Sequence, residues 1–306
     1  MTSILIGSLS ASHSSTLRRA VFNILSTQHA SDGFAQVVDG MPTRGRYRDY
    51  YGSYREEFEQ NVEPSTKAKE IVQSHRDNLE LSAMRVNATV AKAFENAPEG
   101  SDAFRMRLLE IIAIILHDMA VHLFNKFDGG INKPEPQKYP TPPPGIEPAE
   151  PRNMPTELFH THYLEHGQYP NGIADVVGYW LEWYVFGGVI VFDRGQSGKE
   201  CRSAFIHPVG KRQIFELSES QVNQFSQLVT AQSAESLGAG EVLVFKAEKT
   251  TQRVQPYEAF VNMNIYRDRY ERKPSLLEAL SCVVRDDNPP EQELLDEMVD
   301  WNGNKM

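Results

Sequence analysis

Short apolar runs and one helical period predict strand, loop, helix and strand over the first 40 residues. Thr2–Ile6 is a short, partly β-branched run, and a loop of small residues follows it. From Thr16 onward apolar residues recur at helical spacing, and Phe34–Val38 is a second short apolar run. These patterns predict two strands joined by a helix. Such an opening favours a parallel component in the sheet.

Two long helical patterns follow in the first half of the chain. Residues 65–94 are mixed polar with an intermittent apolar face, whereas residues 101–127 are apolar over most of the helical circumference. A helix that is apolar all round is typically buried. We therefore expect the second helix to be the central element of the core.

The second half of the chain predicts one more helix and several strands. Residues 173–183 fit a short amphipathic helix, and residues 189–193 form the clearest strand pattern. Further strands are expected at 203–207, 213–217, 241–247 and 260–266, with a helix at 220–231. The first half has too few strands to form a sheet alone. The prediction is therefore one α/β unit with a mixed sheet over residues 1–306.

Two segments differ from the rest in composition. Residues 128–156 contain nine of the 18 prolines, which indicates an extended linker segment inside the α/β unit. Residues 287–306 are rich in Asp and Glu and are expected to be a solvated acidic tail.

Overall composition narrows the class of protein. The chain has 306 residues, 40% hydrophobic and 24% charged, with a net charge of −10, which excludes global disorder and collagen-like repeats. Two cysteines are too few for a disulfide framework or a four-cysteine zinc site. The first residues lack the pattern of a signal peptide, and the longest apolar run, residues 111–116, is too short for a membrane span. A cytoplasmic protein with no membrane partner is predicted.

The loop from Gly7 to Ser15 is the first candidate for chemistry. It places hydroxyl and backbone N–H groups at a helix N-terminus, which favours an anion, a phosphate or an acyl oxyanion. It lacks the glycine spacing of dinucleotide-binding and P-loop motifs, so no nucleotide cofactor is predicted. The alternative is a helix cap with a tight connection.

Histidines form the second candidate. His160 and His162 would share one face of a strand, close to His166, which is a geometry that suits metal ligands. His117-Asp118 on the apolar helix is typical of metal-dependent phosphohydrolases, but the other ligands of such a site cannot be identified. His117 and His122 would lie about 140° apart around a helix. The alternative is a set of core and loop histidines satisfied by their neighbours.

Glu182 lies among four aromatic residues in the segment Tyr179–Tyr184. A partly desolvated glutamate suits general acid–base work or the binding of a cationic substrate group. The alternative is an aromatic core helix with Glu182 at its solvated end.

Basic and aromatic residues interleave over residues 44–55 and continue on the predicted helix after them. Arginine next to tyrosine is typical of phosphate contact and base stacking. The basic residues of the helix are Lys67, Lys69, Arg76, Arg85 and Lys92. Acidic residues are mixed into the same stretch, so a solvated surface is the alternative.

Several segments resemble a known family. Residues 174–180, 187–195 and 265–271 resemble fungal proteins, some of which are tRNA-dependent, arginine-using cyclodipeptide synthases of secondary metabolism. Leu5–Ser10 is similar to the Gly-x-Ser turn of cyclodipeptide synthases, and Tyr179 with Glu182 is similar to their Tyr…Glu pair. The resemblance implies a Rossmann-like core related to class I aminoacyl-tRNA synthetases.

The resemblance also implies a mechanism. Ser8 or Ser10 would accept the aminoacyl group from tRNA, while Tyr179 and Glu182 would hold its ammonium group. Further carboxylates at Asp175 and Asp193 would hold an arginyl side chain, and the five basic residues named above would contact tRNA. The ester is already activated, so no ATP and no cofactor are expected. Arginyl-tRNA is the favoured partner, and the product would be an arginine-containing diketopiperazine.

Two other classes stay open at this point. A metal-dependent enzyme would use His160, His162 and His166. A non-catalytic interaction protein would use the proline-rich segment and the acidic tail as docking segments.

Overall fold

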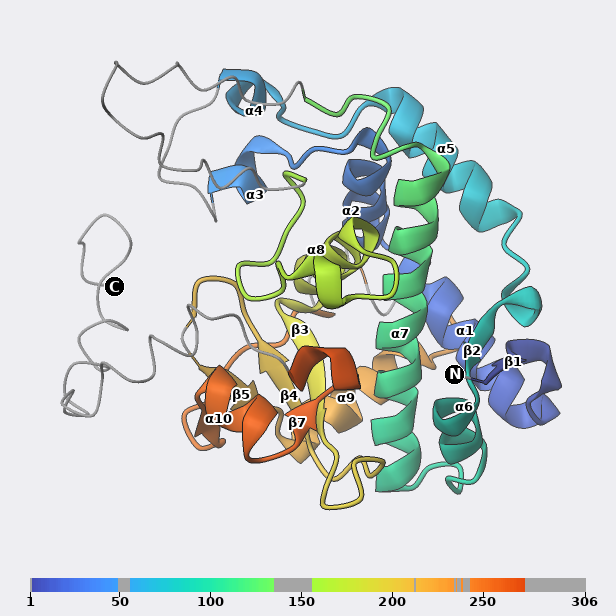
Figure 1. Cartoon of the computed structure of the whole chain (residues 1–306). Helices are drawn as coiled ribbons and strands as arrows, with labels where there is room; N and C mark the ends of the chain where they lie inside the picture. Colours follow the sequence, from blue (N-terminus) through green and yellow to red (C-terminus); the bar gives the residue numbers. More distant parts are fainter. Residues whose placement is uncertain are drawn as a thin grey trace, which may run out of the picture.

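The computed structural model describes residues 2–48, 56–134 and 156–272, with residues 212, 234, 236, 237 and 239–242 excepted. The acidic tail and most of the proline-rich segment lie outside these residues, as does residue 55 with the tyrosines at 50, 51 and 54. The described part is a mixed α/β structure (Figure 1). Its α-helices are α1 (Ala11–Leu25), α2 (Gln28–Asp39), α3 (Arg44–Arg48), α4 (Glu56–Gln60), α5 (Thr66–Asp77), α6 (Ala88–Glu95), α7 (Asp102–Lys126), α8 (Ile173–Phe186), α9 (Glu219–Val229) and α10 (Pro256–Val261).

The described strands form two antiparallel sheets. The strands are β1 (Ser3–Leu5), β2 (Arg85–Asn87), β3 (Val189–Asp193), β4 (Ala204–His207), β5 (Ile214–Glu216), β6 (Arg253–Val254) and β7 (Ile265–Tyr266). The first two form a ribbon, and the others form a sheet of order β6-β5-β4-β3-β7. Every pairing between these strands is antiparallel. The predicted parallel component is therefore wrong for the described strands, and a Rossmann-like core is not confirmed.

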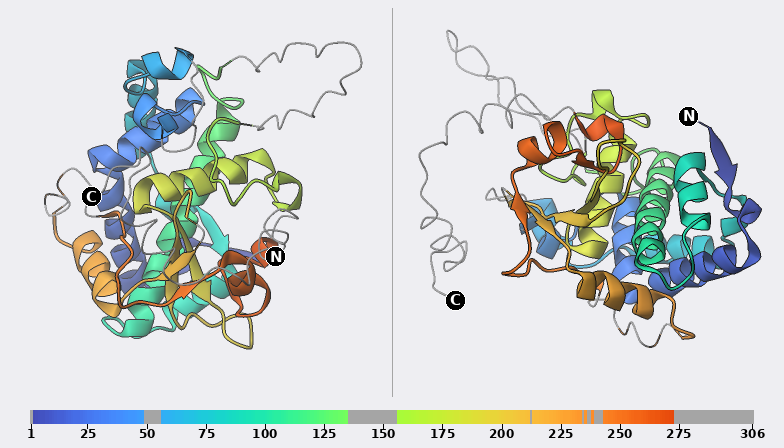
Figure 2. Two further views of the ribbon diagram at one scale, coloured as in Figure 1. Left: turned by 90° about the vertical axis from the view of Figure 1, so that its left-hand side faces the viewer. Right: turned by 90° about the horizontal axis from the view of Figure 1, so that it is seen from below.

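The helix α7 runs through the centre of the molecule, as its apolar pattern predicted. Ser101 begins it by accepting a hydrogen bond from the backbone N–H of Phe104 through its hydroxyl. Figure 2 shows the large sheet on one side of α7 and helices α1 and α6 on the other. By length and composition α7 would also pass as a membrane span, but 78% of that stretch is buried inside the fold, as in the core helix of a globular protein.

The large sheet has two apolar faces. Ile190, Phe192 and Ile206 belong to the main core with α7 and α8, while Val189 and Val191 face a second core beneath residues 159–169 and α10. This alternation follows from the two-residue period of a strand. The sheet and the helices of the first half therefore share one main core.

Several predicted elements are confirmed and four differ from the structure. The strand predicted at 34–38 is the end of α2, because Thr27 caps this helix and Gly40, with φ of 79°, ends it. The single helix predicted over 65–94 is α5, β2 and α6, because residues 85–87 pair with β1. The strand predicted at 260–266 is reduced to β7, because Pro256 begins α10. Residues 243–247 are not a strand.

Candidate functional site

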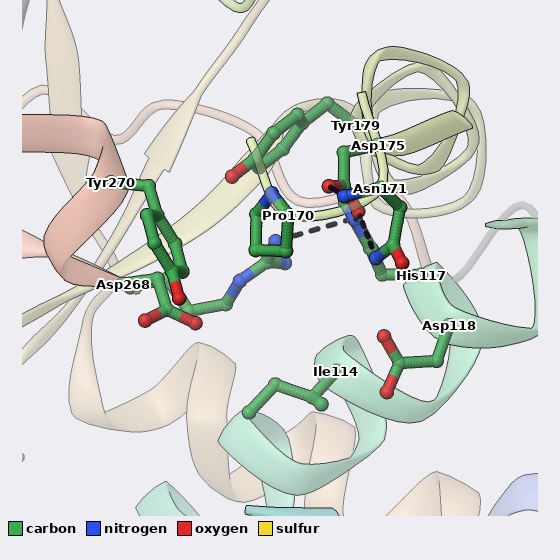
Figure 3. Close-up of a pocket in the computed structure, with 10 residues that line it drawn as sticks. Ile114, His117, Asp118, Pro170, Asn171, Asp175, Tyr179, Asp268 and Tyr270 are labelled. Atoms are coloured by element: carbon green, nitrogen blue, oxygen red, sulfur yellow. Dashed lines mark hydrogen bonds and ion pairs between the residues drawn. The ribbon is translucent and has the colours of Figure 1, made fainter. Parts of the chain in front are cut away.

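A pocket of about 100 Å³ lies where α7, the start of α8 and the segment after β7 meet (Figure 3). Its lining includes mostly polar or charged side chains, namely those of His117, Asp118, Asn171, Asp175, Tyr179, Arg267, Asp268 and Tyr270. Ile114 and Pro170 add apolar surface. The buried floor and the exposed rim of Pro170 and Asn171 make this a site that a small ligand can enter.

His117 is clamped between two carboxylates of α8. Its Nδ1 lies 2.8 Å from Oε1 of Glu182, and its Nε2 lies 3.1 Å from Oδ1 of Asp175. Burial and the charge of Arg267 would lower the pKa of His117, but the two carboxylates outweigh them and raise it to about 9. The imidazole is therefore protonated at neutral pH and donates a hydrogen bond to each carboxylate.

This clamp requires a glycine on α8. A Cβ atom at Gly178 would lie 2.5–2.6 Å from three ring atoms of His117. A helix normally disfavours glycine, so the packing of α8 on the imidazole explains this residue. Gly178 thus lets α8 approach α7 closely enough for both of its carboxylates to reach one histidine.

The aspartate Asp175 is further held by the loop before α8. The backbone N–H and the side-chain amide of Asn171 donate to it at 2.7 and 3.0 Å. Burial would raise the pKa of Asp175, but the hydrogen bonds from His117 and Asn171 lower it below its ordinary value. Asp175 is therefore an ionised carboxylate at the edge of the pocket.

The guanidinium of Arg267 is the second cation that contacts Glu182, in addition to His117. It donates to Oε1 of Glu182, and its Cζ lies 5.0 Å from the ring centroid of Tyr179. Arg194 donates to the backbone carbonyls of Tyr266 and Arg267 and pairs with the buried Glu110. A second buried ion pair therefore positions the backbone that carries Arg267.

Asp118 differs from the other carboxylates of the pocket. Its side chain has no hydrogen bond or ion pair to any described residue, and Figure 3 shows its carboxylate directed from α7 toward the pocket. Burial raises the pKa of Asp118, an effect that His117 and Arg267 oppose and that Asp175 and Glu182 reinforce. Asp118 is thus a carboxylate whose hydrogen-bonding capacity remains available to a ligand.

The charges of the site do not cancel. The carboxylates of Asp118, Asp175, Glu182 and Asp268 surround two cations, His117 and Arg267. When all four are ionised, four negative and two positive charges leave a net charge of −2. A small pocket with this excess attracts a cation.

No protein-family model matches the chain, and no curated protein or solved structure matches it either. A function can therefore be inferred only from the chemistry of the pocket.

The structure brings some of the predicted site residues together. Tyr179 and Asp175 line the pocket, and Glu182 lies directly behind it, fully buried and bonded to His117. Asp193 lies elsewhere, at the end of β3, where it accepts a hydrogen bond from the backbone N–H of Gly195. The carboxylates predicted for substrate binding are therefore divided between the pocket and a structural turn.

The two predicted nucleophiles lie outside the pocket. Ser8 donates to the carbonyl of Leu5, and Ser10 is bonded to Nδ1 of His13 at 2.9 Å. The ring of His13 packs against Phe104 near the start of α7, thirteen residues before His117. At 1.5 Å per residue, this separation along the helix is about 20 Å. The serines and the acidic pocket are two separate places on the molecule.

The histidines predicted as metal ligands are held mainly by backbone groups. His160 Nε2 lies 2.8 Å from the carbonyl of His207, and His162 Nε2 lies 3.0 Å from that of Lys211, while His166 is exposed. Burial holds the pKa of His160 and His207 well below the ordinary value. Within residues 2–48, 56–134 and 156–272, no group of three His, Cys, Asp or Glu side chains is arranged to hold a metal ion.

The basic residues predicted to contact tRNA do not share one helix. Lys67, Lys69 and Arg76 lie in α5, Arg85 in β2 and Lys92 in α6. Two of them are paired with acids, Lys69 with Glu63 and Arg76 with Asp77. Their role in binding tRNA stays a prediction.

Proposed function

We propose that the pocket binds the positively charged amine group of a small substrate. The observation that carries this proposal is the excess of carboxylates over cations around a pocket of about 100 Å³. Asp118 faces it with unused acceptor capacity, and Asp175 is held ionised. Pockets that hold whole drug-sized ligands span roughly 300–1,000 Å³. The smaller volume of this pocket therefore suits one functional group of a substrate, such as its amine, rather than the whole molecule.

The geometry also supports selectivity for an ammonium group. An ammonium offers several N–H donors, and each carboxylate accepts them. The lining includes Ile114 and Tyr270, which provide apolar contact for the carbon attached to the amine. Carboxylates, phosphates and other anions are repelled by the same net charge.

We expect propylammonium chloride to bind with a dissociation constant on the order of 1–10 mM, the range that a four-atom ligand allows. Isothermal titration calorimetry of the full chain at constant ionic strength measures it. Asp118→Asn and Asp268→Asn should each weaken binding about fivefold, because an ion pair of this exposure contributes about 1 kcal/mol. Asp77→Asn, on the exposed end of α5, should leave binding unchanged.

Two matched salts complete this experiment. Sodium propionate has a similar length and the opposite charge, and tetramethylammonium has the same charge but no N–H donor. Neither should bind. Equal binding of propylammonium and propionate, or no binding of propylammonium, would contradict the proposal.

We further propose aminoacyl-tRNA-dependent cyclodipeptide synthesis as a second candidate function. Two observations favour it: Tyr179 and Asp175 line an acidic pocket, and Ser10 is bonded to a histidine. The other ring nitrogen of His13 lies 3.1 Å from the carbonyl of Ala97, which favours a proton there and leaves Nδ1 to accept from Ser10. A serine hydroxyl beside such a base is an activated nucleophile. The separation of about 20 Å along α7 between the two places counts against one shared site.

Under this second candidate, the protein should release a cyclic dipeptide from aminoacyl-tRNAs, arginyl-tRNA among them, without ATP. Mass spectrometry of the small molecules detects the product. Ser8→Ala combined with Ser10→Ala should abolish it without changing the melting temperature, since both hydroxyls lie on exposed residues. Ser74→Ala, another exposed serine, is the control. Absence of product with well-charged tRNA would rule this function out.

A further inference from the structure

Two of the carboxylates around the pocket, Asp175 and Glu182, are held by hydrogen bonds from named partners. Asp175 accepts from His117 and Asn171, and Glu182 accepts from His117 and Arg267. Asp118, by contrast, has no hydrogen bond or ion pair within the described part of the chain, although it lies in the pocket lining. A half-buried carboxyl group without a hydrogen-bond partner gains stability when a ligand donates a hydrogen bond to it.

We propose that Asp118 is the proton-exchanging group of the pocket, and that it contacts a bound primary amine directly. This inference rests on the proposed function. When Asp118 is protonated in the free protein, binding breaks its O–H bond and the proton passes to the solvent. The carboxylate then accepts a hydrogen bond from the ammonium group, which keeps all of its own protons.

The groups that face Asp118 come from three elements. His117 precedes it on α7, Asp175 and Glu182 face it from α8, and Arg267 and Asp268 approach from the segment after β7. Burial and the negative charges of Asp175 and Glu182 favour the protonated form of Asp118, whereas the positive charges of His117 and Arg267 favour its carboxylate. The first group of effects is larger, so the pKa of Asp118 is raised. An added ammonium shifts this balance toward the carboxylate, so binding and deprotonation are linked.

The linkage predicts a specific pH dependence. His117 remains protonated throughout the acidic range, because its pKa is about 9, and the lowered pKa of Asp175 keeps this carboxylate ionised while Asp118 titrates. As the pH falls from 7 toward 4.5, protonation of Asp118 competes with the amine. The affinity for propylammonium should then fall by about fivefold in total, the loss expected for Asp118→Asn, because protonation and this substitution both remove the negative charge of the carboxylate.

Calorimetry with propylammonium chloride at pH 7.0, 6.0, 5.0 and 4.5 tests this inference on the full chain. Comparison of buffers with different ionisation enthalpies gives the number of protons released. The wild type should release a fraction of a proton, at most about 0.4, at the pH where Asp118 titrates, because its two protonation states differ only about fivefold in affinity. Asp118→Asn should bind more weakly at pH 7 and show no release. Asp268→Asn, the matched control in the same pocket, should retain the release.

The outcomes separate the two proposals. Proton release that disappears in Asp118→Asn and persists in Asp268→Asn supports the inference. Binding without proton release, or release that survives in Asp118→Asn, overturns the inference and leaves amine binding intact. Absence of propylammonium binding at pH 7 overturns the proposed function and the inference with it. Carbon NMR of the Asp118 carboxyl group adds a direct readout, since its pKa should fall when propylammonium saturates the protein.

Discussion

Replacing Glu182 with alanine is expected to lower the free energy of unfolding by about 3–5 kcal/mol, because it leaves two buried cations without their shared carboxylate. Glu182 has no exposed surface, and its Oε1 accepts from both His117 and Arg267. Truncation also leaves a cavity between α8 and the sheet. Urea unfolding followed by circular dichroism measures the loss.

The charge contribution can be separated from the cavity. Glu182→Gln keeps the volume, so it should cost less than the alanine variant while still destabilising the protein. A double-mutant cycle of Glu182→Gln and Arg267→Gln should give a coupling of about 1–3 kcal/mol. Glu70→Ala, on the exposed face of α5, should change stability by less than about 0.5 kcal/mol. A coupling near zero would show that the ion pair does not stabilise the fold.

The sequence predicts the elements whose burial dominates their pattern. The helix α7 is apolar over most of its circumference and the strand β3 over nearly its whole length, and both are found as predicted. Residues 34–38 are equally apolar but belong to α2, where Phe34, Val37 and Val38 are buried on one helix face. A run of five residues fits either structure, and here the caps at Thr27 and Gly40 decide for the helix.

The site was predictable only in its local parts. Tyr179 and Asp175 lie on one predicted helix, and their chemistry could be read from their neighbours. Arg267 and Asn171 join them only through the packing of distant segments, and sequence spacing carries no information on such contacts. A local signal that the prediction did not use is Gly178, since a glycine in the interior of an apolar helix is consistent with the close approach of another group, here His117.

Sequence spacing also could not show that Ser8 and Ser10 lie far from Tyr179 and Glu182. The prediction joined the turn at Ser8 and Ser10 to Tyr179 and Glu182 through the resemblance to cyclodipeptide synthases, which implies a Rossmann-like core. Among the described strands β1 pairs only with β2, and it lies beyond α7 from the large sheet (Figure 2). The topology, rather than any single residue, separates the two predicted halves of the site.

Raising the pH from 6.5 to 9 is expected to cost about 3 kcal/mol of stability through His117 alone, at up to about 1.4 kcal/mol per pH unit. The pKa of His117 is about 9 in the folded protein, against an ordinary value of 6.5. Its contribution is therefore complete below pH 6.5, where folded and unfolded chains both carry the proton. It is lost as the pH rises through 9, because the folded state binds the proton more tightly and must give it up.

The buried histidines of the second core act in the opposite direction and in another range. Burial lowers the pKa of His160 and His207, so their contribution is complete above pH 6.5 and is lost as the pH falls below it. Between pH 6.5 and 9 they stay neutral in both states and add no slope. Stability measured across pH should therefore decline on both sides of about pH 6.5, with a different set of histidines responsible for each side.

Urea unfolding at half-unit steps from pH 5.5 to 9.5 tests this assignment. His117→Gln should be less stable than the wild type at pH 6.5, and its stability should stay nearly flat up to pH 9. His122→Gln, an exposed histidine on the same helix, should retain the alkaline decline of the wild type. An unchanged alkaline slope in His117→Gln would mean that the imidazole is not held protonated between Asp175 and Glu182, and the net charge assigned to the pocket would then be more negative by one.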